Sequence, residues 1–332
     1  MKRLIVLILV SSVVATACSS ASGDASITVY SGRSEVLIQP VIDAFTEATG
    51  IGVAVKYAGS ADLAATILEE GESSPADVFL SQDPASLGTI ALDGLFGILP
   101  STILDRVPTR FSDEHGRWVG TSGRARVVVY DASTMGPDEL PPTEDGFVDT
   151  EWSGRVGIAP TNGSFLAFVA TKILLDGEAG TLAWLEGMAG NDSPKYPKNS
   201  PIVAAVNSGQ IDAGLVNHYY LLRALAENPD EPGRNFFFSV ATAGSLVMPA
   251  GAGVLATSNN TDSAQKFIEF LLSDTSQRYF AEETFEYPLV PGIDADPSLP
   301  PLVSIPTPNI NLSDLATVLD LATDLVAQAG LL

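Results

Sequence analysis

The sequence predicts an α/β protein, in which strands alternate with helices around a mainly parallel sheet. Short runs of β-branched residues alternate with longer segments whose apolar residues recur every three or four positions. Gly, Pro, Asp and Ser stand between these segments, where helices usually begin and end. The 332 residues are 45% apolar and only 17% charged, which is enough apolar material for large cores and too little charge for a disordered chain.

The first α/β unit begins at residue 27 and is marked by helix caps. Gly50 follows a helix with an apolar stripe, at the position where a C-terminal glycine is common. Ser60 and Asp83 precede two further helices as N-caps, and Pro84 occupies the first position of the second helix. The expected strands are 27–30, 53–55 and 77–80, and the expected helices are 37–48, 61–70 and one from residue 84 onward.

Two strands are expected to cross between two lobes. Residues 125–130 (ARVVVY) are too apolar for the edge of a sheet, and residues 251–257 provide a return strand. The other expected elements are strands 157–159 and 211–216 and helices 164–175, 180–189, 219–227, 263–272, 275–283 and 312–328. The resulting prediction is a first lobe of residues 27–125 and 252–293, and a second lobe of residues 126–251 and 294–332.

The charge balance excludes several kinds of partner. The chain has 40 acidic and 17 basic side chains, for a net charge of −23. Nucleic acids and anionic lipid surfaces are bound through clustered Lys and Arg, so an acidic surface would repel both. We therefore expect a cationic partner or a ligand held in a local pocket.

The N-terminus has the features of an export signal. A short basic start precedes an apolar run, residues 4–14, that is too short to span a bilayer as a mature helix. The small residues 15–17 then precede Cys18, an arrangement that resembles the lipobox of bacterial lipoproteins. We expect residues 1–18 to be a signal peptide with Cys18 as a lipid anchor, and residues 19–26 to be a flexible tether. The protein would then lie on the outer face of the cell membrane; the alternative is ordinary cleavage, which removes Cys18 and leaves the protein in the periplasm.

Several sequence strings resemble periplasmic ferric-ion-binding proteins of ABC importers. They occur in that family's order from about residue 27 to the C-terminus, and they are VYSGRSE (29–35), PADVFLSQD (75–83), SGRARVVVY (122–130), WSGRVGIAPTNGSF (152–165), YPKNS (196–200), VNHYYLLR (216–223) and EYPL (286–289). The resemblance implies a type II periplasmic-binding-protein fold, whose two lobes are joined by two crossover strands and close on Fe(III) with a synergistic anion such as carbonate, phosphate or citrate. It also implies delivery to an ABC transporter permease by a monomeric binding protein.

Tyr219 and Tyr220 are the candidate metal ligands. Fe(III) is a hard, highly charged acceptor, which favours anionic oxygen donors such as phenolate. If Asn217 caps the helix, both tyrosines lie in its first turn, where both can reach one cleft and the positive helix end favours phenolate. On a strand they would face opposite ways.

The anion requires hydrogen-bond donors. The segment 161–164 (TNGS) lies between a strand and a helix, where free backbone N–H groups can form an anion nest. A guanidinium adds a forked, permanently charged donor. From these features and the family resemblance, the expected anion-binding residues are Arg124, Asn162, Gly163, Ser164, Asn199 and Asn217.

The first lobe departs from the family's pattern. Where members that match these strings have a His ligand and a Glu ligand, this chain has Ser34 and Gln82. Glu35 and Asp83 are the nearest acidic replacements, but Asp83 is also a simple N-cap before Pro84, and Glu35 also suits the first turn of a helix. Ser34 and Gln82 are expected in the cleft as donors to the anion or to a metal-bound water.

The remaining candidates favour a binding protein over an enzyme. His115 lies in a polar loop, and His218 adjoins the tyrosines but is expected to point away from them. No nucleophile elbow, triad or HExxH motif is visible, which argues against an exported hydrolase. The alternative within the binding class is another small ligand, such as a phosphonate, thiamine or a polyamine.

Overall fold

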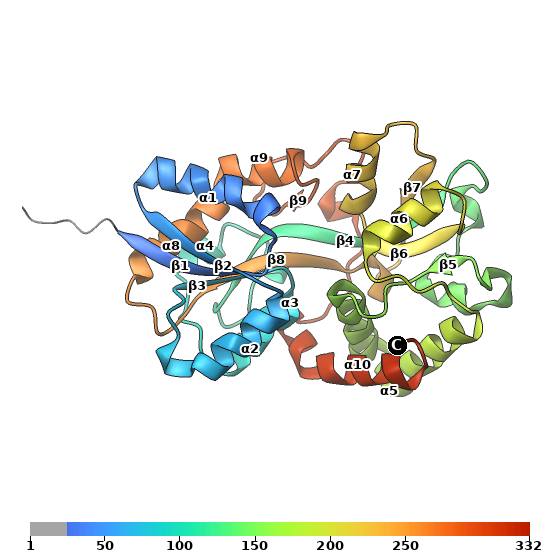
Figure 1. The fold of residues 1–332 in the computed structure, drawn as a ribbon, viewed down its shortest axis with the longest axis horizontal. Coiled ribbons are helices and arrows are strands. Elements are labelled where there is room, and N and C mark those ends of the chain that lie inside the picture. The colour runs from blue at the N-terminus through green and yellow to red at the C-terminus, as the bar shows by residue number, and fades with distance from the viewer. Residues whose placement is uncertain (1–24) are drawn as a thin grey trace, which may run out of the picture.

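Two long antiparallel strands occupy the middle of the computed structural model, which describes residues 25–332 (Figure 1). They are β4 (Val119–Asp131) and β8 (Val247–Val254), and every residue of both is buried. β8 pairs with β3 of one lobe, and β4 pairs with β6 and β7 of the other. This confirms the predicted α/β architecture of two lobes joined by two crossover strands.

The first lobe is built on one end of this strand pair. Its strands lie in the order β2-β1-β3-β8-β4, and β1 pairs in parallel with both β2 and β3. A parallel pair requires a helical crossover, which explains the alternation seen in the sequence. The elements are β1 (Ser26–Ser31), α1 (Glu35–Thr49), β2 (Gly52–Tyr57), α2 (Ser60–Glu70), β3 (Val78–Ser81), α3 (Pro84–Leu92), α4 (Ser101–Leu104), α8 (Thr261–Leu271), α9 (Asp274–Glu282) and β9 (Tyr287–Pro288).

The second lobe continues the sheet from β4 to β6 and β5, with β7 also pairing with β4. Its long helical stretch is interrupted at Gly177, whose φ of 76° is one that glycine adopts easily. That break explains why the sequence pattern predicted two helices, 164–175 and 180–189. The elements are β5 (Val156–Gly157), α5 (Gly163–Gly190), α6 (Asn199–Asn207), β6 (Ala213–Asn217), α7 (Tyr219–Glu227), β7 (Gly233–Phe236) and α10 (Leu319–Gln328).

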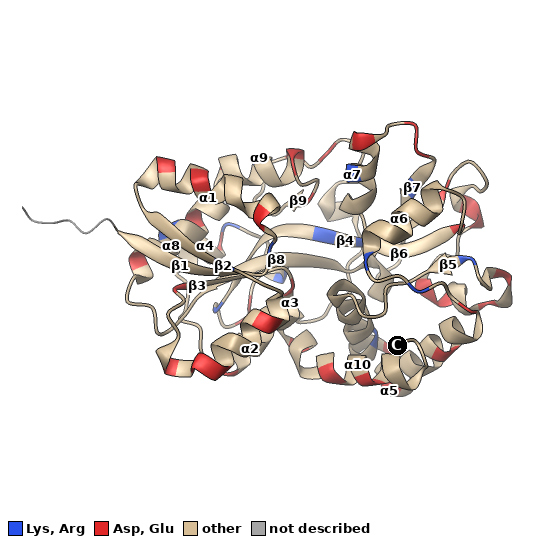
Figure 2. Cartoon of the chain, viewed as in Figure 1, with Lys and Arg blue, Asp and Glu red and all other residues tan. Residues whose placement is uncertain are grey.

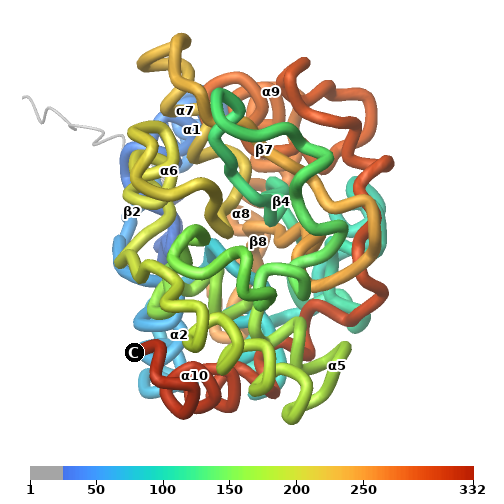
Figure 3. The backbone as a smooth tube through the Cα atoms, turned by 90° about the vertical axis from the view of Figure 1, so that its right-hand side faces the viewer, coloured from blue at the N-terminus to red at the C-terminus, as the bar shows by residue number. Residues whose placement is uncertain are grey.

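The C-terminal segment differs from its predicted position. The predicted helix 312–328 consists of a 3₁₀ stretch, η8 (Leu312–Val318), followed by α10. η8 packs mainly on α3 of the first lobe and also contacts α5 of the second, on which α10 packs. Figure 3 shows α5 and α10 at the same end of the molecule. The C-terminal segment therefore contacts both lobes, and the lobe boundaries stay a prediction. Gly88 permits the contact with η8, because a Cβ there would lie 2.5 Å from the carbonyl oxygen of Ser313.

Acidic side chains lie mainly on the outer helices and loops, whereas basic residues occur on the central strand β4 (Figure 2). Within residues 25–332, no helix is both long enough and apolar enough to cross a membrane. The predicted signal peptide and Cys18 lie outside the described residues.

Candidate functional site

A cleft of about 520 Å³ lies between the two lobes, next to the crossover strands. The first residues of several helices point into it, so it is lined by loops and helix N-termini from both sides. The lining residues are Gly32, Gly59, Ser60, Ala61, Gln82, Asp83, Arg124, Asn162, Gly163, Ser164, Lys198, Asn217, Tyr219, Tyr220 and Met248. Most of the predicted site residues therefore meet in one cavity.

Tyr219 and Tyr220 begin α7, directly after β6, and both line the cleft. Their rings stack with centroids 4.3 Å apart, and only 3% of Tyr219 is exposed. Burial, followed by the neighbouring Tyr219, raises the pKa of Tyr220. The raised pKa keeps the Tyr220 phenol neutral at physiological pH unless a bound cation displaces its proton.

Asn217 does not cap this helix, contrary to the sequence-based expectation. His218 holds the cap position, and its side chain makes no capping hydrogen bond. Asn217 instead ends β6, where its Oδ1 accepts a hydrogen bond from Arg126 at 3.1 Å. Asn199 holds it in place, since Asn199 Oδ1 accepts a hydrogen bond from the Asn217 backbone N–H at 2.9 Å.

The predicted anion nest forms the N-terminus of α5. Asn162 is the cap residue, and its Oδ1 accepts hydrogen bonds from the backbone N–H and the hydroxyl of Ser164, at 3.1 and 2.6 Å. Asn199 is 1% exposed and does not line the cleft; its amide donates to Asn162 Oδ1 at 3.2 Å. Asn199 therefore positions the nest instead of contacting a ligand, while Gly163 leaves the backbone open to the cleft.

Arg126 is a site residue that the sequence analysis missed. It is 2% exposed, and its Nη1 donates to Ser164 Oγ at 3.2 Å and to Asn217 Oδ1. Burial lowers its pKa to about 10 despite the opposing effect of the nearby Tyr220 and Tyr219. Its Nη2 has no partner within residues 25–332. The sequence did contain a signal for Arg126. In the string GRAR (123–126), Arg124 and Arg126 are two residues apart, and such residues on a strand lie on the same face of the sheet.

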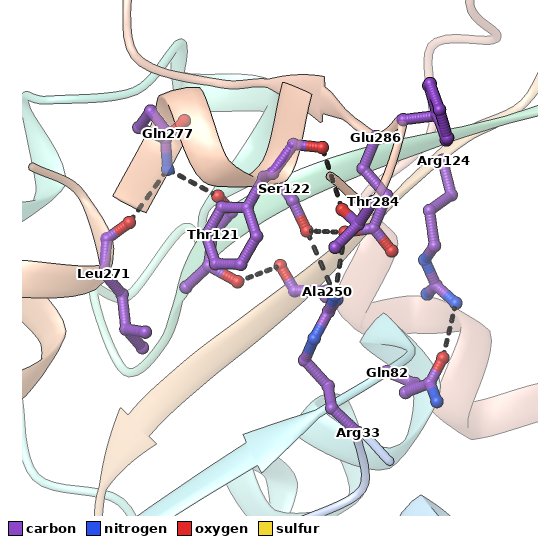
Figure 4. Close-up of polar contacts among 12 residues, drawn as sticks. Arg33, Gln82, Thr121, Ser122, Arg124, Ala250, Leu271, Gln277, Thr284 and Glu286 are labelled. Atoms are coloured by element: carbon purple, nitrogen blue, oxygen red, sulfur yellow. Dashed lines mark hydrogen bonds and ion pairs between the residues drawn. The ribbon is translucent and has the colours of Figure 1, made fainter. Parts of the chain in front are cut away.

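The side chains of Arg124 and Gln82 meet on the first-lobe side of the cleft, as Figure 4 shows. Arg124 Nη1 donates to Gln82 Oε1 at 3.2 Å, while Arg124 Nε and Nη2 lack partners in the described part of the chain. Beside them, buried Arg33 donates to Glu286 at 2.9 Å, and Ser122 donates to the same carboxylate at 2.6 Å. Burial alone would raise the pKa of Glu286, but Arg33 and the other donors lower it.

The acidic candidates of the first lobe are not positioned as free ligands. Ser34 and Glu35 are exposed and do not line the cleft, which corrects the expectation that Ser34 lies in it. Asp83 does line it, but its carboxylate accepts hydrogen bonds from the backbone N–H and hydroxyl of Ser86 at 2.7 and 3.1 Å. It is thus the N-cap of α3, as the simpler interpretation held.

Neither histidine lines the cleft. His218 is fully buried, with Nδ1 accepting from the Ala125 N–H at 3.1 Å and Nε2 lying 2.7 Å from the Phe285 carbonyl. Burial lowers its pKa to about 4. His115 is 63% exposed and lies 3.3 Å from Glu114. Residues 25–332 contain no group of three His, Cys, Asp or Glu side chains that could hold a metal, so a metal here would depend on phenolates and an added anion.

Comparison with protein families and curated proteins gives consistent matches. A family model described as bacterial extracellular solute-binding protein matches residues 73–310, and a second with the same description matches residues 27–97. The chain is 38% identical over 314 residues to the major ferric iron-binding protein of Neisseria meningitidis serogroup B, covering 92% of this chain and 93% of the relative. It is 32% identical over 325 residues to the Fe(3+)-binding periplasmic protein of Serratia marcescens, covering 97% and 95%.

Solved structures agree with these matches. Iron-bound HitA from Pseudomonas aeruginosa is similar with a TM-score of 0.86 and 32% identity, covering 92% of this chain and 99% of the other. A Trichodesmium protein (IdiA, FutA) in complex with iron and citrate ligands is similar with a TM-score of 0.81 and 29% identity, with the same coverage.

Proposed function

The chain belongs to the family of bacterial extracellular solute-binding proteins, and from this premise we propose how its cleft serves iron transport. The protein is an extracytoplasmic binding protein that captures ferric iron with a synergistic anion and delivers it to an ABC-type importer. It acts as a monomer, and the permease is its membrane partner. Three observations support this function. The fold matches that of an iron-bound binding protein, the chain is 38% identical to a ferric iron-binding protein over 92% of its length, and the cleft is lined by two phenols and by hydrogen-bond donors for an anion.

The stacked tyrosines are the observation that carries the metal assignment. Tyr219 and Tyr220 present two phenol groups from one helix turn to a cleft that the anion nest at the N-terminus of α5 also lines. Phenolates and an oxyanion together supply hard oxygen donors, which Fe(III) prefers. Arg124 and Arg126 add positive charge that holds the anion, and Asn199 and Asn217 keep the nest in position.

Replacing Tyr219 or Tyr220 by Phe should abolish the ferric-phenolate absorbance band and weaken iron binding at least a hundredfold. The ring and its packing remain, so the free energy of unfolding should change by only about 1 kcal/mol. Each phenol must release a proton to bind, so affinity should fall up to tenfold per phenol for each unit that pH decreases. A ferric titration with visible spectroscopy measures both effects.

Ser34→Ala is the matched control for this titration, because Ser34 is exposed and outside the cleft. It should bind iron like the wild type. If both Tyr→Phe proteins also bind iron like the wild type, the metal site is misplaced, and another small ligand such as a phosphonate becomes the better hypothesis.

A binding role also fits the remaining polar residues better than a catalytic one. Both ring nitrogens of His218 are engaged by backbone groups, and His115 pairs with a surface glutamate. Neither therefore stands as a free base beside a nucleophile, as hydrolytic mechanisms require.

Lipidation of Cys18 is the anchor that the sequence supports. Cys18→Ala should release the protein from the membrane fraction or block its processing, because no other cysteine exists to carry the lipid. Fractionation and mass spectrometry of the mature N-terminus measure this. A variant that stays membrane-bound and is processed normally would show that the lipoprotein assignment is wrong.

A further inference from the structure

The first-lobe side of the cleft presents hydrogen-bond donors and no free metal ligand. Ser34 and Glu35 lie outside the cavity, and the carboxylate of Asp83 is occupied by Ser86. Gln82 is neutral and already accepts a hydrogen bond from Arg124. If this lobe contacts the cargo, it must therefore do so mainly through donors, which select an anion.

The N-terminus of α2 supplies part of this donor surface. Gly59, Ser60 and Ala61 all line the cleft, and Gly59 at the cap position has no side chain to occupy the first-turn N–H groups. Ser60 Oγ accepts a hydrogen bond from the Gln82 N–H at 2.9 Å, which leaves the hydroxyl proton free to donate. Gly32 keeps this approach close, since a Cβ there would lie 2.0 Å from Ser60 Oγ.

Arg124 is the independent observation that points to a ligand. Its side chain lines the same cavity with only 4% of the residue exposed, yet Nε and Nη2 have no partner within residues 25–332. Leaving buried donors of a charged group unpaired is costly, so an acceptor is expected there. An oxyanion between Arg124 and the first turn of α2 would satisfy both.

The second-lobe nest, residues 162–164 at the N-terminus of α5, is the other part of the cleft that favours an anion. Gly163 and Ser164 line the cleft at the N-terminus of α5, although the N–H and hydroxyl of Ser164 already donate to Asn162 Oδ1. Arg126, which donates to Ser164 Oγ, has an Nη2 without a partner within residues 25–332. Among the charged residues that line the cavity, Arg124 and Lys198 are cationic and only Asp83 is anionic. The volume of about 520 Å³ lies within the range of about 300–1,000 Å³ typical of sites for organic ligands.

We propose that Ser60, Gln82 and Arg124 form a second oxyanion subsite, and that the cargo is ferric iron chelated by a polycarboxylate. One carboxylate occupies this subsite, another occupies the second-lobe nest, and the tyrosines bind the iron between them. The proposal rests on the proposed function, and it narrows the choice among carbonate, phosphate and citrate to an anion with several separated carboxylates.

Ser60→Ala is the decisive variant, because it removes the free hydroxyl donor of the subsite and adds no metal ligand to the cleft. The wild type should bind ferric iron at least tenfold more tightly with citrate than with carbonate. Ser60→Ala should lose at least tenfold in affinity with citrate and change less than threefold with carbonate. Arg124→Gln should also lose citrate-supported binding, with its fold checked by thermal unfolding.

Lys56→Gln is the matched control for Arg124→Gln, since it removes the same unit of charge from an exposed side chain of the same lobe. Ser34→Ala is the control for Ser60→Ala, and both controls should leave the two titrations unchanged. Iron-free tricarballylate should bind the wild-type apoprotein and bind Ser60→Ala at least tenfold more weakly, as measured by calorimetry. Equal iron binding with citrate and carbonate, or equal losses with both in Ser60→Ala, would overturn the subsite. The proposed function would stand in either case as long as the Tyr→Phe variants lose iron.

Discussion

His218 stands one residue from the proposed iron ligands, yet its ring belongs to the protein interior. It connects the start of α7 to the Ala125 N–H of β4 and to the Phe285 carbonyl after α9. Asn235 adds a hydrogen bond to the His218 carbonyl at 2.9 Å. The histidine therefore fixes the orientation of the helix that carries both tyrosines.

Burial of His218 predicts a loss of stability in acid. Its pKa of about 4 lies below the ordinary value of 6.5, so the unfolded chain binds more protons between these pH values. The contribution is fully present above pH 6.5 and is lost as pH falls toward 4, with a total of about 3 kcal/mol. Denaturant titrations at pH 7, 5 and 4 measure it.

Two variants isolate this contribution from that of the carboxylates. His218→Gln should flatten the loss between pH 6.5 and 4, whereas His115→Gln should leave it unchanged because His115 is exposed. An unaltered pH dependence in His218→Gln would contradict the assignment. Iron release should therefore be compared at pH values where the protein is shown to remain folded.

At the level of elements, periodicity and caps predicted most of the fold. Pro84 after Asp83 and glycine at position 50 marked true helix ends, and the apolar run 125–130 is part of the buried strand β4. α6 was missed, because its side chains at 199–207 show little amphipathic pattern when the helix packs on both β6 and α7. β7 was missed because its burial depends on pairing with β4, which is distant in sequence.

The site was predictable only in part. The tyrosines and residues 162–164 come from contiguous strings, so local order brings them to the cleft. Arg126 requires knowing which face of β4 meets α5, and Ser60 requires knowing where α2 begins relative to β3. The exposed positions of Ser34 and Glu35 depend on how α1 starts, which the family strings do not specify.

The attachment of η8 to the first lobe predicts a specific loss of stability. Ser313 Oγ accepts from Trp118 Nε1 at 3.1 Å and donates to Asp113 Oδ1 at 2.9 Å, and all three residues are buried. Ser313→Ala leaves Trp118 Nε1 and Asp113 Oδ1 unpaired, while Asp113 Oδ2 keeps the hydrogen bonds from the backbone N–H groups of His115 and Arg117. The free energy of unfolding should therefore fall by about 2 kcal/mol. Exposed Ser304→Ala is the control and should change it by less than about 0.5 kcal/mol. Equal effects in the two variants would contradict the role of this contact.

For the whole molecule, the two crossover strands predict a hinge. Ligands drawn from both lobes favour a closed state, so ferric iron with citrate should reduce the radius of gyration. Small-angle scattering with and without ligand measures this, and Tyr219→Phe should show no ligand-dependent change. Equal radii for the wild type in both states would argue against closure. Because η8 contacts both α3 of the first lobe and α5 of the second, the C-terminal segment should be strained or rearranged by closure, and the precise lobe boundaries stay a prediction.

The uneven distribution of charge has a consequence for the speed of capture. The chain carries a net charge of −23, and acidic residues are spread over its outer helices and loops (Figure 2), while Arg124 and Lys198 line the cleft. An approaching anionic ferric chelate is repelled by the acidic outer surface and attracted only within roughly a Debye length of the cleft, about 8 Å at physiological ionic strength. Added salt screens the long-range repulsion first, so the association rate should increase with ionic strength, the reverse of most electrostatically steered encounters. A binding protein of this kind would gain cargo fastest in media of high ionic strength.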